Sequence, residues 1–248
     1  MNAIISFKKV SKSFSDKVVI RGLDLDIFEG ETITIIGGSG TGKSVLLKLL
    51  LGVIPPDEGR IFFRGRDITA MNEWELINVR REIGMLFQGA ALFDSLTVAE
   101  NIVYPVREHF KYPEKRFRAI AEEKLAMVGL SEAINLMPAE LSGGMKKRVG
   151  LARAVATDPA VVLYDEPTTG LDPANTMRIN KLIRELQRKL HITSIVVTHD
   201  MASAFLVSDR LAMLYNGRIE FVGTPEEAKK SSNSVVQHFI QGYIGDGA

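Results

Sequence analysis

Apolar residues along the chain follow two patterns that together predict an α/β fold. Short β-branched runs bounded by glycine, proline or polar residues are typical of strands, and they cover residues 4–10, 17–28, 31–38, 59–69, 160–166, 193–200 and 210–223. Segments with apolar residues three or four positions apart are typical of helices, and they cover residues 44–52, 75–84, 97–110, 114–130 and 174–190. The later strands are apolar at consecutive positions, which predicts a parallel sheet covered by helices on both faces.

The predicted helices gather in the middle of the chain, between two strand-rich parts. Pro105, Pro113 and Pro138 fall in this helical part and are expected to break its helices, because proline lacks the N–H group that continues a helix. We therefore expect a single domain with an inserted helical subdomain. Its parts are an α/β core at about 1–88 and 157–248, and a helical insertion at about 89–156.

Composition excludes several kinds of protein. The formal net charge is +1, from 31 basic and 30 acidic side chains, which gives no support for nucleic-acid binding. The absence of cysteine excludes disulfides and thiolate sites, and it fits a reducing compartment. No apolar run approaches the ~20 residues of a membrane span, and the N-terminus lacks the layout of a signal peptide. We expect a cytoplasmic protein that reaches a membrane only through a partner.

The segment GGSGTGKS follows a predicted buried strand and precedes an apolar helix. It matches the pattern G-x-x-x-x-G-K-[ST], in which glycines let successive N–H groups point at phosphate oxygens and the helix dipole adds to the attraction. Lys43 can reach the β- and γ-phosphates, and the Ser44 hydroxyl can ligate Mg²⁺. A nucleoside triphosphate is therefore expected to bind at Gly37, Gly38, Ser39, Gly40, Thr41, Gly42, Lys43, Ser44 and Val45.

Further polar residues end other strand-like segments. Asp165 suits the Mg²⁺ shell, usually through water, and Glu166 can polarise an attacking water as general base. His199 can contact the γ-phosphate, and Gln88 can reach Mg²⁺ or the attacking water. Each has a structural alternative, an acidic turn or a structural side chain, and for Gln88 the two interpretations are balanced. Because α/β ligands bind beyond the strand ends, the phosphate-binding segment, the acidic pair and the histidine are expected at one sheet edge.

The segment LSGGMKKR places Ser142-Gly143-Gly144 at the start of a basic helix. The structural interpretation is an ordinary serine N-cap. The N–H groups and dipole of such a helix end also bind anions. Because the phosphates of one nucleotide already have a binding segment, a second phosphate site suggests a nucleotide shared between two copies of the chain.

The ordered set GGSGTGKS, Gln88, LSGGM, VVLYDE, TTGLD and THD resembles the ATP-binding subunits of ABC transporters over nearly the whole chain. The resemblance implies a P-loop NTPase fold of the ABC ATPase type, with a RecA-like mixed sheet core, an N-terminal antiparallel β subdomain and an inserted α-helical subdomain. It implies ATP hydrolysis with Mg²⁺, two ATP molecules sandwiched in a homodimer, and integral-membrane permease partners. Ser142, Gly143 and Gly144 would then serve the ATP of the opposite subunit.

The same resemblance implies roles for individual residues. Asp172 in TTGLD matches a loop that crosses the dimer interface. Phe14 matches an aromatic that stacks on adenine, although without the resemblance it would be interpreted as a core or hairpin residue. Met145, Lys146 and Lys147 replace glutamines common in the family, but the Ser-Gly-Gly is intact, so closure on ATP is expected. The catalytic and metal-binding roles fall on Lys43, Ser44, Gln88, Asp165, Glu166 and His199.

The segments LFQGAALFDSLTVAENIVYPVREH, GGSGTGKSVLLK and LSGGMKKR resemble the ATPases of Mla/Mce-type lipid transport, also called toluene-tolerance proteins. This implies phospholipid transport that maintains outer-membrane lipid asymmetry, an Mce-domain lipid-binding partner, and a peripheral position at the cytoplasmic face of the inner membrane. The stretch after Gln88 is also similar in amino-acid importers, which remain an alternative. Leu92 and Phe93 would fit a groove that receives a permease helix if they are exposed, or the subdomain core if they are not.

Two other classes of protein compete with a transport ATPase. An ABC ATPase that acts on DNA or ribosomes generally carries two cassettes or a long coiled-coil insertion, and this chain has neither. A P-loop small-molecule kinase would have no use for the Ser-Gly-Gly segment. The segment 234–248 is amphipathic and is expected to dock on its own or a partner subunit.

Overall fold

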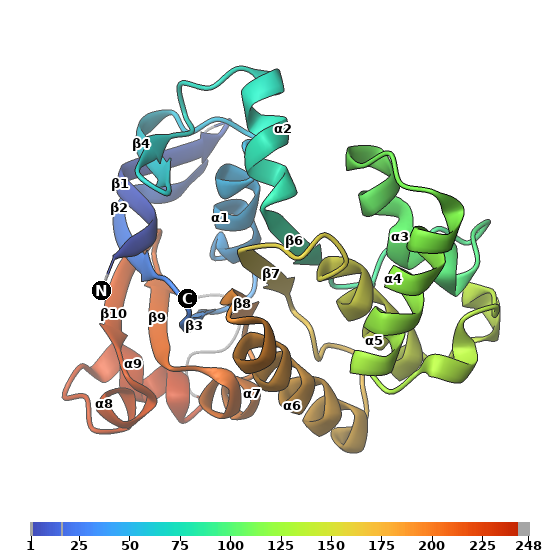
Figure 1. Ribbon diagram of the computed structural model, residues 1–248. Helices are drawn as coiled ribbons and strands as arrows, with labels where there is room; N and C mark the ends of the chain where they lie inside the picture. The colour runs from blue at the N-terminus through green and yellow to red at the C-terminus, as the bar shows by residue number, and fades with distance from the viewer. Residues whose placement is uncertain (1, 16, 243–248) are drawn as a thin grey trace. The chain divides into compact units, whose positions relative to one another are not determined.

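The computed structural model describes residues 2–15 and 17–242, and the chain divides into two compact units. The first unit joins the N-terminal part of the chain, up to Arg80, to the C-terminal part from Thr193 onward. The second unit is the intervening segment Arg81–Ile192. Figure 1 shows the order of the elements along the chain.

An antiparallel sheet forms the N-terminal part of the first unit. It is built from β1 (Ala3–Phe14), β2 (Lys17–Phe28), β4 (Glu58–Phe63) and β5 (Arg66–Asp67), in the order β2-β1-β4-β5. Alternating apolar side chains such as Ile5, Phe7 and Leu25 are buried, as period-two strands predict. This sheet confirms the predicted antiparallel β subdomain, although β1 continues to Phe14, beyond the predicted end.

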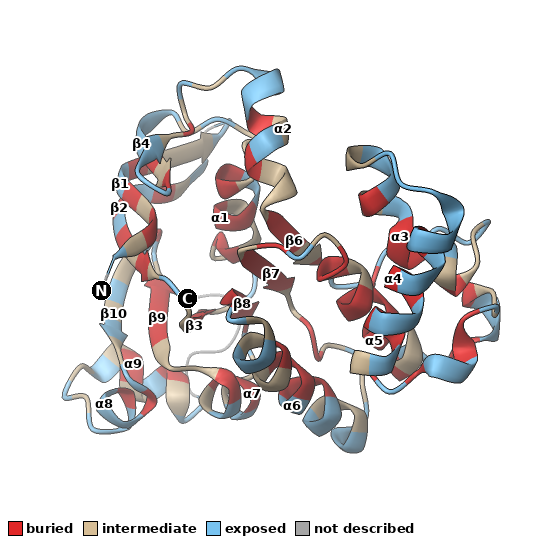
Figure 2. Cartoon of the chain, viewed as in Figure 1, coloured by how far each residue is buried: buried red, intermediate tan, exposed pale blue. Residues whose placement is uncertain are grey.

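A mostly parallel set of strands forms the rest of the first unit. β3 (Thr32–Ile36) pairs in parallel with both β8 (Thr193–Thr198) and β9 (Arg210–Tyr215), and β9 forms an antiparallel hairpin with β10 (Arg218–Gly223). Every residue of β3 and β8 is buried, and β8 and β9 appear as buried strands in Figure 2. The prediction of buried parallel strands from consecutive apolar residues is confirmed. The helices of this unit are α1 (Lys43–Leu50), α2 (Glu73–Arg81), α7 (Met201–Val207), α8 (Pro225–Lys229) and α9 (Ser234–Ile240).

The second unit contains a short parallel strand pair and a group of helices. The pair is β6 (Ile83–Leu86) with β7 (Val161–Asp165). The helices α3 (Val98–His109), α4 (Glu114–Met127) and α5 (Gly143–Ala154) pack on one another (Figure 1). The remaining elements are the 3-10 turns η1 (Ser131–Ala133) and η2 (Pro138–Glu140), and the long helix α6 (Pro173–Leu190).

The structure corrects some predicted boundaries. Pro105 does not break a helix but lies inside α3. The buried residues Ile102, Val103 and Val106 anchor α3 in the helical group, and this packing outweighs the hydrogen bond that proline cannot donate. The helix predicted over 75–84 ends earlier, because its last residues belong to β6. The short helices α7 and α8 were not expected from the apolar pattern.

The C-terminal segment docks on its own chain as far as the structure describes it. Val236 and Phe239 of α9 are buried against Leu211 and Met213 of β9. The rest of the predicted docking segment, residues 243–248, lies outside the described residues. Within the described part of the chain, none of the helices has both the length and the apolar character needed to cross a bilayer.

Candidate functional site

The predicted phosphate-binding segment connects β3 to α1 in the first unit. A Cβ atom on Gly37 would lie 2.5 Å from the backbone oxygen of Leu214, so the close approach of β9 requires glycine. Gly42 has a φ of +104°, and a Cβ there would lie 2.7 Å from Cγ1 of Val19 on β2. Two strands thus fix the curl of the loop, and only glycine fits at these contacts.

Lys43 is buried at the start of α1 and closes the loop. Its Nζ donates hydrogen bonds to the backbone oxygens of Gly37 and Gly38, both at 2.8 Å, and Thr41 Oγ1 donates to the Gly38 oxygen at 2.9 Å. Ser39 and Gly40 are exposed at the tip, while Ser44 and Val45 are half-buried in the first turn of α1. The ammonium and the N–H groups at the helix start form a positive environment that suits phosphate.

His199 lies beside the phosphate-binding segment. Ile36, the last residue of β3, is paired in parallel with Thr198, the last residue of β8. Gly37 and His199 follow these two residues directly, so both emerge at the same edge of the strand set, as expected. His199 is exposed, and the next residue, Asp200, caps α7 by accepting hydrogen bonds from the N–H groups of its first turn.

Phe14 ends β1 with 45% of its surface exposed, so it is not a core residue. The Lys12 ammonium lies 5.6 Å from the centre of its ring. Phe14 pairs with Lys17 of β2, and β2 also contains Val19, which packs at the Gly42 position. An exposed aromatic ring therefore stands on the strand pair that supports the loop, an arrangement suited to stacking on a flat base.

The acidic pair and Gln88 emerge together in the second unit. Leu86 of β6 is paired in parallel with Tyr164 of β7, so Gln88 and the Asp165–Glu166 pair follow the same ends of the two strands. Glu166 has a φ of +46°, which is uncommon for a residue with a side chain. Its carboxylate accepts a hydrogen bond from Thr169 Oγ1 at 3.3 Å, and its backbone oxygen accepts one from the Thr169 N–H.

The segment Ser142-Gly143-Gly144 begins α5. Ser142 is the N-cap and its Oγ accepts a hydrogen bond from the Met145 N–H at 3.3 Å. The structure therefore contains the N-cap of the structural interpretation, and the anion-binding role stays a prediction. Gly143 is exposed, whereas a Cβ on Gly144 would lie 2.5 Å from Asn175 Oδ1.

Asp172 is exposed and caps α6. Its carboxylate accepts hydrogen bonds from the Asn175 N–H at 2.9 Å and from Asn175 Nδ2 at 2.5 Å. The first of these, from the backbone, is the main cause that lowers the pKa of Asp172. Asn175 thus connects Asp172 to the Gly144 position, a link that the sequence did not reveal because it depends on how α5 and α6 pack.

Sequence reasoning missed the role of Lys147. This lysine is buried, and its Nζ donates to the backbone oxygens of Gln88 and, at 3.3 Å, of Glu166. Burial lowers the pKa of Lys147, and the negative charges of Glu166 and Asp165 oppose that effect. The departure from the family's usual glutamine was visible in the sequence, but the contacts were not.

Leu92 and Phe93 lie a few residues after Gln88, in the segment between β6 and α3. Phe93 is 44% exposed and its ring lies 4.6 Å from that of Tyr104, while Leu92 is half-buried. Asn101, fully buried, accepts a hydrogen bond from the Phe93 N–H and donates to the Phe93 oxygen. Phe93 is therefore held at the surface and does not belong to the core of the helical group.

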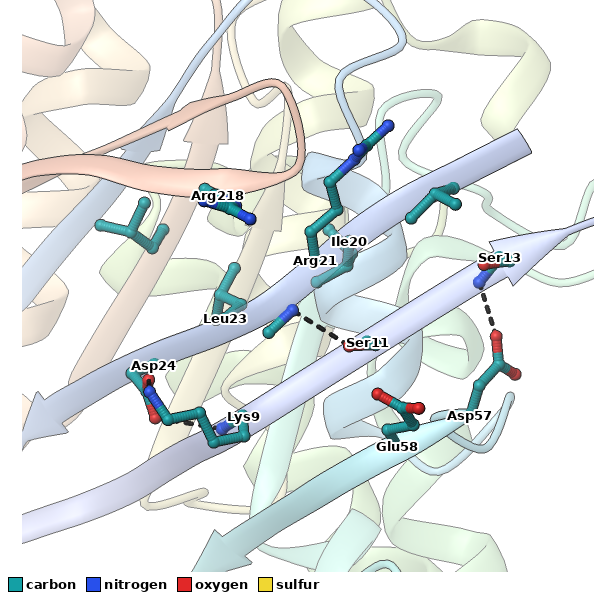
Figure 3. A pocket seen from close by; sticks show the side chains of 13 residues that line it. Lys9, Ser11, Ser13, Ile20, Arg21, Leu23, Asp24, Asp57, Glu58 and Arg218 are labelled. Atoms are coloured by element: carbon teal, nitrogen blue, oxygen red, sulfur yellow. Dashed lines mark hydrogen bonds and ion pairs between the residues drawn. The ribbon is translucent and has the colours of Figure 1, made fainter. Parts of the chain in front are cut away.

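A separate polar cavity of about 910 Å³ lies on the antiparallel sheet and β10 (Figure 3). Arg21 and Arg218 border it together with the Lys9–Asp24 ion pair, in which the charged atoms are 2.6 Å apart. None of the residues expected to bind nucleotide lines this cavity.

Comparisons with known proteins support the resemblance. A family model described as ABC transporter matches residues 20–169. The intermembrane phospholipid transport system ATP-binding protein MlaF of Haemophilus influenzae is 40% identical over 239 residues, which cover 96% of this chain and 90% of that protein. The probable ribonucleotide transport ATP-binding protein mkl of Mycobacterium leprae is 40% identical over 98% of this chain and 70% of its own length.

A solved structure agrees in fold. The dimeric post-hydrolysis state of the ATP-binding cassette MJ0796, bound to ADP and Pi, superimposes with a TM-score of 0.81 at 32% identity, over 89% of this chain and 98% of that one. The predicted fold class, with its antiparallel β subdomain, is confirmed. The chain therefore belongs to the ABC transporter family, as one of its ATP-binding and ATP-hydrolysing subunits.

Proposed function

We propose that this ATPase energises the transport of phospholipids between membranes and so maintains outer-membrane lipid asymmetry. The observation that carries the proposal is the 40% identity to MlaF over almost the full length of both chains. The ATPase subunit itself does not select the cargo, because its proposed site binds nucleotide. The lipid assignment therefore depends on the partners that the chain recruits.

The proposed nucleotide site takes residues from two copies of the chain. In one copy the segment 37–45 binds the ATP phosphates and Phe14 stacks on adenine. The second copy contributes Ser142, Gly143 and Gly144 to the γ-phosphate, and Asp172 lies in the loop that crosses between copies. The exposed Gly143 and the first-turn N–H groups of α5 suit this contact with an anion.

Glu166 is the proposed general base for in-line attack of water on the γ-phosphate. The hydrogen bond that its carboxylate accepts from Thr169 Oγ1 helps to orient the carboxylate. His199 contacts the γ-phosphate, Gln88 orients the attacking water, and Lys43 stabilises the charge that develops on the transferred group. Closure of the two copies assembles the site, and release of products reopens it.

Mg²⁺ is the proposed metal cofactor. A serine hydroxyl, an amide oxygen and a carboxylate are the hard oxygen donors that Mg²⁺ prefers, and the chain offers them as Ser44, Gln88 and Asp165, partly through water. Within the described residues no group of three or more histidine, cysteine or acidic side chains could hold a metal ion. Bound Mg²⁺ would neutralise charge on the β- and γ-phosphates.

Integral-membrane permease subunits are the proposed partners, at the cytoplasmic face of the inner membrane, together with an Mce-domain lipid-binding protein. The helical segment 89–156 is the proposed inserted subdomain of a single ABC domain. The exposed Phe93–Tyr104 ring pair on this segment offers an apolar surface for a permease helix. Asn101 holds this surface in place through its bonds to Phe93.

A Glu166→Gln variant tests the catalytic assignment. It keeps the shape of the side chain but removes the base, so we expect normal ATP binding, a trapped dimer in size-exclusion chromatography and almost no phosphate release. Hydrolysis at the wild-type rate would reject Glu166 as the base.

The cargo is tested by isolating the chain with its membrane partners and reconstituting the complex. We expect a polytopic permease and a lipid-binding subunit to co-purify, and fluorescent phospholipid to transfer between vesicles only with ATP. The Glu166→Gln complex is the control and should not transfer lipid. Co-purification of a permease without ATP-dependent lipid transfer would reject the phospholipid assignment and leave the ATPase assignment intact.

A further inference from the structure

Lys147 is a buried charged side chain that the proposed mechanism does not use. It is 5% exposed and lies one turn after the start of α5. Its Nζ donates hydrogen bonds to two backbone oxygens, those of Gln88 and Glu166. These oxygens belong to the two residues of the second unit that are proposed to act on the attacking water.

An ammonium group inside a protein is unfavourable unless its donors are satisfied and its charge is balanced. The two backbone oxygens satisfy donors of Lys147, and the negative charges of Asp165 and Glu166 balance part of its charge. An apolar side chain of similar length would fill the same space without the desolvation penalty. The hydrogen bonds from the ammonium to the Gln88 and Glu166 oxygens, which an apolar side chain cannot make, therefore explain why a lysine is buried at position 147.

The two segments that Lys147 joins both have unusual backbones. Glu166 has a positive φ, and so do Ala90 and Ala91, which follow Gln88. Arg153, on the same helix as Lys147, donates to the backbone oxygens of Ala90 and Ala91 at 2.5 and 2.7 Å. Helix α5 thus holds the irregular loop after β6 with Lys147 and Arg153, and Lys147 also reaches the segment after β7.

We propose that Lys147 is a positioning residue for ATP hydrolysis, which fixes the backbones of Gln88 and Glu166 relative to each other and to helix α5. The proposal rests on the proposed roles of Gln88 and Glu166. The direction of the Glu166 carboxylate depends on its backbone, so releasing the Glu166 oxygen from Lys147 changes where the base points. A misplacement of about 1 Å reduces a rate by roughly 100-fold in well-organised sites.

Three variants of the full-length chain test this role. Lys147→Met removes the charge and the donors at similar length, and Lys147→Arg restores a cation with several donors. Lys124→Met is the matched control, because Lys124 is also a buried lysine of the second unit, and its ammonium pairs with Asp158 at 2.6 Å and with Glu123 at 3.0 Å. For each variant the ATP dissociation constant, kcat and the melting temperature are measured.

We expect Lys147→Met to lower kcat by about tenfold or more and to change ATP affinity by less than about twofold, because Lys147 bonds to the two residues proposed to act on the attacking water, whereas phosphate binding is assigned to the segment 37–45. Lys147→Arg should recover at least about a third of the wild-type kcat. Lys124→Met should lower the melting temperature but leave kcat within about twofold of wild type.

The outcomes separate this proposal from the proposed function. If Lys147→Met keeps kcat within about twofold of wild type while Glu166→Gln abolishes turnover, the positioning role is wrong and the catalytic assignment stands. Equal losses of kcat in Lys147→Met and Lys124→Met, or no recovery with arginine, would also overturn it, because both indicate a purely structural effect. If Glu166→Gln itself hydrolyses ATP normally, the proposed function has failed.

Discussion

Gly144, in the first turn of α5, has no room for a methyl group. A Cβ there would lie 2.5 Å from Oδ1, 2.7 Å from Cγ and 3.2 Å from Nδ2 of Asn175. The Asn175 side chain is held by its hydrogen bond to Asp172 at 2.5 Å. Gly144→Ala must therefore displace the amide, and the cap of α6 loses one of its hydrogen bonds.

The expected size of the effect follows from two opposing contributions. Forcing an extra methyl into a packed site costs about 1–3 kcal/mol of folding free energy. Replacing a helical glycine by alanine raises the free energy of unfolding by about 0.5–1 kcal/mol. Because Asn175 is half-buried and its amide can turn toward solvent, we expect a net loss of about 1 kcal/mol. In a chain of this size that loss lowers the melting temperature by about 2–4 °C.

Thermal unfolding of a small set of variants measures this effect. Gly143→Ala is the matched control in the same helical turn, since its Cβ would meet only Leu171, at 4.0 Å, and it should be at least as stable as wild type. Asn175→Ala removes the side chain that the new methyl group would meet. The free energy of unfolding of the double variant Gly144→Ala/Asn175→Ala should therefore be about 1 kcal/mol higher than the sum of the two single losses predicts. A Gly144→Ala protein as stable as Gly143→Ala, or strictly additive single effects, would refute the reasoning.

Two other changes give sharp expectations. Lys43→Ala should weaken ATP binding by about tenfold or more in a titration with a fluorescent analogue, since a charge-assisted hydrogen bond contributes about 1.5–3 kcal/mol; unchanged affinity would contradict its phosphate role. The Asn175 backbone N–H lowers the pKa of Asp172 in the folded state. This cap therefore stabilises the folded protein at pH values above the ordinary aspartate pKa of about 3.9. The stabilisation is lost as the pH falls through the lower pKa of the folded state. Asp172→Asn should then reduce the acid-side fall of the melting temperature, and an identical fall would contradict the assignment.

The apolar pattern predicted those elements whose burial is visible in their own sequence. The run in 193–198 is apolar or β-branched throughout, and β8 is buried throughout. Helix α5 lacked such a signal, because eight of its twelve residues are buried and they include Lys147 and Arg148. The prediction that Pro105 breaks a helix was wrong, because the packing of α3 outweighs the local helix-breaking effect of proline.

The predicted site also contains some features that the sequence signals and others that it does not. The glycines at 37 and 42 were predicted from a motif, and the structure gives their physical reasons in Leu214 and Val19, which lie far along the chain or on another strand. The contacts of Lys147 and Asn175 had no sequence signal. They depend on the way separate segments pack, and the position of Lys147 within LSGGMKKR does not reveal which atoms its ammonium contacts.

Helix α5 connects two different nucleotides in the proposed dimer. Its first residues, from Ser142, are proposed to contact the ATP of the second copy, whereas Lys147, one turn later, holds the backbones of Gln88 and Glu166 in its own copy. A helix is rigid over one turn, so a displacement at Ser142 moves Lys147 as well. In the proposed dimer, closure on one ATP would therefore affect the position of Glu166, the proposed base for hydrolysis of the other ATP. In the proposed dimer, the buried lysine would therefore link the position of the base at one site to the contact that the same helix makes at the other site.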